Sequence, residues 1–155
     1  MPANRLIGIP ALLLTLLPAL VPAQPAASGD APGHQRELVE LPPPVREEIL
    51  TNMRDHLATI EKVSRKLAAG DYGSAADTAE AGLGMSAIMA HGGPQRAQYL
   101  PADWRKIGMA MHQAASRFAI TARDAETDAD LRAAFTSLAD VMAQCVACHA
   151  AFRLH

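Results

Sequence analysis

The sequence predicts an all-α protein, an up-down-up-down bundle of four helices. Half of its residues are hydrophobic but only six are aromatic. Alanine is abundant while valine and isoleucine are scarce, a composition that favours helices over sheets. Apolar residues recur every three or four positions along four long segments, as in helices that bury one side. Short connections between these segments predict antiparallel neighbours in a bundle.

Two helices are expected in the first half of the chain. The first should span residues 43–69 and end at Gly70, because glycine readily adopts the left-handed backbone that stops a helix. The second should span residues 74–90, with Asp71 or Ser74 as its cap. The apolar stripe of the first helix consists of Ile49, Met53, Leu57, Ile60, Val63 and Leu67.

Two more helices are expected after a loop at residues 92–100. The third should span residues 101–125. The fourth should begin near Asp128, capped by Thr127 or by Asp128 itself. We expect one continuous stripe of this last helix to face the core. That stripe consists of Leu131, Phe135, Leu138, Met142, Cys145, His149 and Phe152.

The N-terminus has the pattern of a secretory signal peptide. Arg5 precedes an apolar run at residues 6–21, and a small-residue cleavage site follows it, so we expect cleavage after Ala23. An uncleaved membrane anchor is the alternative, but the run is broken by two prolines and is shorter than the roughly 20 residues of a span. Residues 24–42, rich in proline and alanine, should form a flexible leader. The folded domain is then residues 43–155.

The most informative stretch is Cys145-Val146-Ala147-Cys148-His149, a C-x-x-C-H pattern near the C-terminus. This pattern is the attachment signature of c-type haem. On a helix, Cys145, Cys148 and His149 share one face. Two thiols can therefore form thioethers with the haem vinyl groups while the imidazole binds the iron. Export would bring the chain to the compartment where such haem is attached.

Other functions for these residues are less well supported by the sequence. A thiol–disulfide oxidoreductase needs a stabilised thiolate, whereas Cys145 and Cys148 lie near a helix C-terminus, whose dipole opposes one. A structural zinc site would lack its fourth ligand. A peroxidase would need a distal acid–base residue, for which only His56 is a candidate. The formal charge is −2 and no basic patch is present, so a nucleic-acid partner is not indicated.

The ending, from Gln144 to Arg153, resembles that of the class II c-type cytochromes, the cytochrome c′ and c556 group. The likeness extends over residues 43–155. It implies a four-helix bundle with one covalent haem c, tethered by Cys145 and Cys148 and ligated by His149, with Arg153 near a haem propionate. An ordinary helix-end role for Arg153 is the alternative. The family resemblance further implies a periplasmic, non-enzymatic electron carrier that meets redox partner proteins transiently, with no membrane attachment after signal cleavage. Members of this group often form homodimers.

The resemblance also proposes a sixth iron ligand. The group often carries R-x-x-x-M in its first helix, and Met53 matches the methionine. Ile49 stands in the arginine's place, and Arg46 lies one turn before it. A methionine at helical spacing is also a common core residue. In that case the iron is five-coordinate, and an apolar pocket of Met53, Leu57 and Phe118 would admit nitric oxide or carbon monoxide. The remaining candidates are His56 as a rival ligand and Met111 as a residue lining the haem.

Overall fold

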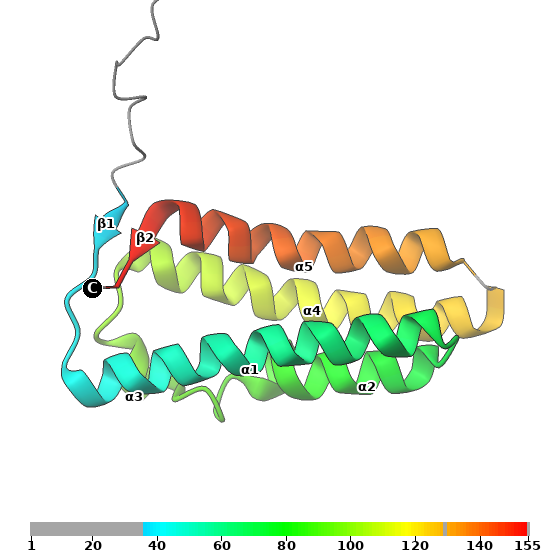
Figure 1. Ribbon diagram of the computed structural model, residues 1–155, viewed down its shortest axis with the longest axis horizontal. Helices are drawn as coiled ribbons and strands as arrows, with labels where there is room; N and C mark the ends of the chain where they lie inside the picture. Colours follow the sequence, from blue (N-terminus) through cyan, green and yellow to red (C-terminus); the bar gives the residue numbers. More distant parts are fainter. Residues whose placement is uncertain (1–35, 129, 155) are drawn as a thin grey trace, which may run out of the picture. The chain divides into compact units, whose positions relative to one another are not determined.

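The protein is mainly helical, in agreement with the predicted all-α class. The structure, a computed structural model, describes residues 36–128 and 130–154 (Figure 1). The predicted signal peptide, residues 1–23, and residues 24–35 of the predicted leader lie outside the described residues. The elements in chain order are β1 (Glu37–Leu38), α1 (Pro43–Ala68), α2 (Tyr72–Leu83), the 3₁₀ turn η1 (Met85–Ala87), α3 (Gly93–Ala97), α4 (Ala102–Asp128), α5 (Leu131–Ala151) and β2 (Phe152–Arg153).

The turn between α1 and α2 is formed by the residues that the sequence indicated. Gly70 has a φ of 74°, and the backbone N–H of Asp71 donates to the carbonyl of Lys66 at 2.9 Å. These are features of a glycine-terminated helix end. The side chain of Asp71 then caps α2 by accepting from the N–H of Ser74 at 3.2 Å. The predicted stop and the predicted cap are both confirmed.

Helix α2 is shorter than predicted, because it ends at Leu83 and not near residue 90. Gly84 takes an extended conformation. The carboxylate of Glu80 accepts from the N–H of Ser86 at 3.1 Å and from the hydroxyl of Ser116 on α4 at 2.6 Å. These bonds hold the chain after Gly84 in a separate turn. The expected loop at residues 92–100 contains the short helix α3.

The connection between α4 and α5 lies later in the chain than predicted. Helix α4 continues to Asp128, and α5 begins at Leu131. The α5 cap is Asp130, whose side chain accepts from the N–H of Ala133 at 3.0 Å. The prediction of Thr127 or Asp128 as the cap was therefore wrong. Aspartate at the cap position satisfies an N–H that the first turn of a helix leaves free.

Four of the helices lie side by side (Figure 1). Extensive contacts join α1 with α2, α2 with α4, and α4 with α5, whereas α1 and α5 share no such contact in the described part of the chain. Alanines make up much of the packed surface of α2 and α4, so these helices can approach closely. The main core cluster consists of Val63, Leu67, Ala75, Ala76, Ala79, Leu83, Met111, Ala114, Ala115, Phe118, Ala119, Ala122, Ala125, Ala134, Leu138 and Val141.

Phe118 is the largest fully buried side chain of the main core cluster. We expect Phe118→Ala to lower the free energy of unfolding by about 3–5 kcal/mol, because it removes a large buried ring and leaves a cavity. Ile120→Ala on the same helix is the matched control, since Ile120 is 60% exposed and should change stability by less than about 0.5 kcal/mol. Urea denaturation measures both. Equal losses in the two variants would contradict the assignment of this core.

A second, smaller cluster lies where α1 begins and α5 ends. This end cluster has Val39, Leu41, Ile49 and Phe152 buried at its centre, and partly buried side chains surround it. Strands β1 and β2 pair in parallel, and the N–H of Val39 donates to the carbonyl of Arg153 at 3.0 Å. The packed part of the described residues thus includes residues 37–41, which precede Pro43, because Val39 and Leu41 are buried in the same cluster as Phe152.

Candidate functional site

The C-x-x-C-H residues occupy the last turns of α5. Cys145 and Cys148 are half-buried free thiols, and His149 is exposed. Cys145 packs against the main core cluster, whereas Cys148 packs against the end cluster. The motif therefore lies at the junction of the two clusters, with its imidazole accessible from outside.

The predicted core-facing stripe of α5 was right for Leu138, Cys145 and Phe152 but wrong for its other members. The structure buries Ala134, Leu138 and Val141. It leaves Leu131, Phe135, Met142 and His149 exposed. Small side chains on α5 meet the buried alanines of α4, so the two helices pack closely along this column. Phe135 and Met142 lie beside the buried residues, whereas Leu138 is among them. Cys145 and Cys148 lie on the buried side of α5, whereas His149 lies on its exposed side.

Met53 lies on the first helix within reach of the same region. It is half-buried and packs in the end cluster, as does Cys148. Thr59 marks the side of α1 that faces α2, because its side chain would lie 2.7 Å from a Cβ on Gly82. Leu57, two residues before Thr59, points to the opposite side of the helix and is 73% exposed. The tertiary structure thus brings Met53, but not Leu57, into a packed cluster.

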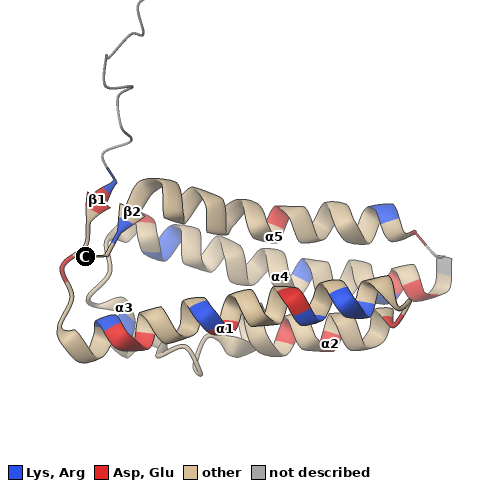
Figure 2. Ribbon diagram, viewed as in Figure 1, with Lys and Arg blue, Asp and Glu red and all other residues tan. Residues whose placement is uncertain are grey.

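The exposed apolar side chains of α5 also point away from its neighbour. Ser137 and Thr121 line a depression between α5 and α4, so Ser137 marks the side of α5 that faces α4. Phe135 and Met142, two residues before and five after it, are on the other side of the helix. Residues 141–151 contain no Lys, Arg, Asp or Glu, and Figure 2 shows this uncharged stretch at the end of α5.

Helices α1 and α5 share no extensive contact among the described residues, and each carries large exposed apolar side chains. We call their exposed members the apolar seam. Exposed apolar area of this kind usually marks a binding site or an interface. Helix α5 is also long and apolar enough to cross a membrane by length and composition. The apolar seam consists of Leu57, Phe135, Met142 and Val146.

Two arginines lie at the end of the protein that carries the motif. The Nε atom of Arg46, on the first turn of α1, is buried and has no hydrogen-bond partner. A buried donor without a partner is costly, by about 1–3 kcal/mol. Arg153 follows the motif in β2 and has an exposed side chain. Both residues can offer guanidinium N–H groups to an anionic group at this end.

The structure places the three residues expected to line a gas-binding pocket, Met53, Leu57 and Phe118, in different surroundings. Phe118 belongs to the main core cluster, Met53 belongs to the end cluster, and Leu57 faces solvent. Met111 is buried in the main core cluster as well.

The two thiols of the motif are in their protonated form at neutral pH. Burial raises the pKa of Cys145. Burial, followed by the neighbouring Cys145, raises the pKa of Cys148 to about 11. Both cysteines also lie at a helix C-terminus, where the helix dipole disfavours a negative charge. The site thus holds two neutral thiols one turn apart.

His56, the predicted rival iron ligand, belongs to a cluster of three histidines. Its Nε2 lies 3.4 Å from Nδ1 of His91, and the ring centroids of His91 and His112 are 5.5 Å apart. Burial first, then the charges of the two other histidines and Arg96, lower the pKa of His56 to about 4. Burial likewise lowers the pKa of His91. His56 faces this cluster on the α2 side of α1.

This cluster should make stability depend on pH. The pKa of His56 is about 4 in the folded chain against 6.5 otherwise, so the unfolded chain binds the extra proton between these values and stability falls with falling pH. Acidification from pH 7 to pH 4 should cost up to about 3 kcal/mol through His56 alone. Urea denaturation at both pH values measures it. His56→Gln should reduce the difference, and an unchanged difference would contradict the assignment.

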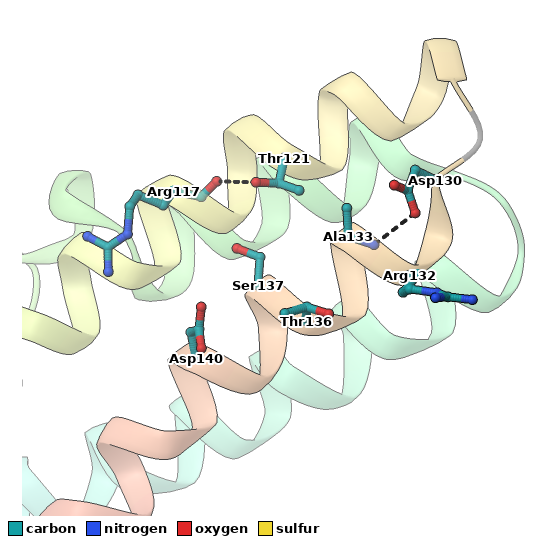
Figure 3. A pocket seen from close by; sticks show the side chains of 8 residues that line it. All are labelled: Arg117, Thr121, Asp130, Arg132, Ala133, Thr136, Ser137 and Asp140. Atoms are coloured by element: carbon teal, nitrogen blue, oxygen red, sulfur yellow. Dashed lines mark hydrogen bonds between the residues drawn. The ribbon is translucent and has the colours of Figure 1, made fainter.

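A surface depression lies nearer to the start of α5 than the motif does. It is an open site between α4 and α5 (Figure 3). Its side chains are mostly polar, and two of its bonds, from Thr121 to the carbonyl of Arg117 and from Ala133 to Asp130, belong to the helices themselves. The depression is lined by Arg117, Thr121, Asp130, Arg132, Ala133, Thr136, Ser137 and Asp140.

Comparison with known proteins adds no assignment to this geometry. No protein-family model, no curated protein and no solved structure matches the chain. A function for the site must therefore be argued from the motif and from the packing around it.

Proposed function

We propose that this chain is a periplasmic c-type cytochrome, built as a four-helix bundle, that carries one covalent haem c and transfers single electrons. The observation that carries the proposal is the placement of C-x-x-C-H. Both thiols are half-buried at the junction of two apolar clusters, while His149 faces outward beside the apolar seam. The protein would act on no substrate and would meet its redox partners transiently.

The residues around the motif fit a haem in number and in chemistry. Cys145 and Cys148 would tether the ring, and His149 would bind the iron. Met53 can supply a thioether ligand from the facing helix, since it shares the end cluster with Cys148. The bound haem would supply the one-electron chemistry, and the chain would set the axial ligands and exclude water.

A bound haem would cover the exposed side chains of the apolar seam. Leu57 is 73% exposed and Val146 is 68% exposed, which is unusual for large side chains beside a core. Full burial of one aliphatic or aromatic side chain stabilises a protein by about 1.5–3 kcal/mol. For the four seam residues, the area still exposed corresponds to roughly 4 kcal/mol at that rate. A flat apolar ring system between α1 and α5 would recover much of it.

The arginines offer partners for the haem propionates. Nε of Arg46 is buried without an acceptor, and charge-assisted bonds from guanidinium to carboxylate are among the stronger hydrogen bonds. Arg46 would take the role that the resemblance gives to the arginine of the first helix, which Ile49 replaces here. Arg153 would contact the second propionate from β2.

The same observations argue against the other functions of the motif. A redox-active dithiol needs a thiolate near neutral pH, whereas burial raises the pKa of Cys148 to about 11. Thiols that form thioethers with a haem do not need a lowered pKa in the mature protein. For zinc, no three His, Cys, Asp or Glu side chains in the described ranges converge on a common point.

A gas-binding haem protein with five-coordinate iron is the second candidate. The observation that favours it is the packing of Met53, which already contacts an apolar cluster in the manner of a core residue. In that case the thioether would not bind the iron, and carbon monoxide or nitric oxide could reach the distal side. The two candidates share the haem and differ only in the role of Met53.

Optical spectra of the chain expressed with export to the periplasm test the proposal. We expect a covalent haem signal and, in the ferric form, a low-spin spectrum that carbon monoxide does not alter after reduction. An immediate carbon monoxide shift would favour the second candidate. A chain without haem, or one recovered only with membranes through α5, would overturn the proposal.

A further inference from the structure

Three histidines from separate parts of the chain meet on the α2 side of α1. His56 belongs to α1, His91 to the turn after η1, and His112 to α4. The ring centroids of His56 and His91 are 4.7 Å apart, and all three rings are partly buried. The electron-transfer proposal uses none of them, and the cluster faces away from the apolar seam.

We propose that His56 and His91 chelate one divalent transition-metal ion of the zinc or copper class, through Nε2 of His56 and Nδ1 of His91. These two nitrogens are 3.4 Å apart. In a tetrahedral site with metal–nitrogen bonds of about 2.0–2.1 Å, two ligand nitrogens are separated by about 3.3 Å. The spacing of the two nitrogens therefore matches that of two ligands on one ion. In the structure this contact is a hydrogen bond between the rings, which a bound ion would replace after a small rotation of the rings.

His112 supports the pair from α4. Its Nδ1–H donates to the carbonyl of Leu83 at 2.8 Å, which leaves Nε2 as the nitrogen with a free lone pair. Metal-binding histidines commonly use their other ring nitrogen in this way. Among the described residues no three His, Cys, Asp or Glu side chains already converge on one point. The chelating unit is therefore the His56–His91 pair, and water or Nε2 of His112 after a ring rotation completes the shell.

Some charged groups around the three histidines favour the binding of a cation, and others oppose it. Burial keeps the rings neutral, and neutral imidazole is the form that binds a metal. Arg96 places a positive charge near His56 and His91, which weakens cation binding. Glu48 partly offsets Arg96, and Asp55 attracts a cation near His91. The opposing charge of Arg96 should thus keep the affinity of the pair below that of a site without a nearby cation.

The test is equilibrium dialysis of the full, haem-loaded chain against ZnCl₂ at pH 7.5, with metal counted by elemental analysis. We expect a single Zn²⁺ ion per chain. His56→Gln and His91→Gln should each weaken binding by about tenfold or more, with helix content unchanged by circular dichroism. His34→Gln, which removes a histidine of the N-terminal segment, is the matched control and should bind as the parent does.

Arg96→Gln should change the Zn²⁺ affinity in the opposite direction. It removes the opposing charge and should tighten Zn²⁺ binding several-fold, an effect that a merely structural histidine cluster would not produce. The absence of Zn²⁺ binding by the parent chain would overturn the proposal. Binding that persists in both His56→Gln and His91→Gln would also overturn it, since the ion would then belong to other ligands such as the C-x-x-C-H residues.

Discussion

A chain that carries both Cys145→Ala and Cys148→Ala is expected to lose all covalently bound haem. These are the only cysteines of the protein, so no other thiol can form a thioether. Haem staining of a denaturing gel measures the loss directly. Ser137→Ala, on the same helix but on the side that faces α4, is the control and should retain full staining.

The same double variant should also be much less stable than the haem-loaded parent. Without the ring, the apolar seam stays exposed, and the roughly 4 kcal/mol associated with its burial is lost. For a domain of this size, such a loss corresponds to a fall in melting temperature of about 15 °C or more. Thermal denaturation followed by circular dichroism measures it. Covalent haem in the variant, or an unchanged melting temperature, would contradict the proposed site.

The second large effect is expected from Met53→Leu. Leucine has a similar volume and should preserve the end cluster at a cost below about 1.5 kcal/mol, but it removes the sulfur. If Met53 binds the iron, the ferric spectrum should change from low-spin to high-spin, and carbon monoxide should bind the reduced protein. The potential should fall by part of the roughly 0.8 V range over which axial ligands tune haem.

Met109→Leu is the matched control, because Met109 is a partly exposed methionine of α4 outside both clusters. It should leave the spectrum and the potential unchanged. A parent protein that is already high-spin and carbon-monoxide-sensitive, with Met53→Leu identical to it, would show that Met53 is a core residue. The gas-binding candidate would then replace the electron carrier.

Local signals in the sequence were sufficient where neighbouring residues decide the structure. Gly70 ends α1 with a positive φ, and Asp71 caps α2, both within one turn of chain. The end of α2 was missed because part of its cause is not local. Glu80 of α2 binds Ser116, 36 residues away on α4, and no pattern within the segment itself carries that information.

For the candidate site too, the sequence supplied one part of the prediction and the tertiary structure supplied the rest. The C-x-x-C-H spacing by itself determined which residues could hold haem, because i, i+3 and i+4 share a helix face wherever the helix packs. Only the tertiary structure decided which side of α5 is buried, since that depends on the fit between Ala134 and Val141 and the alanines of α4. The packing of the helices also left Leu57, Phe135 and Met142 exposed. It placed Met53 in the same cluster as Cys148. It brought His56 into contact with His91. Periodicity identifies an apolar face to within a column, whereas the choice between adjacent columns depends on the shapes of the helices that meet there.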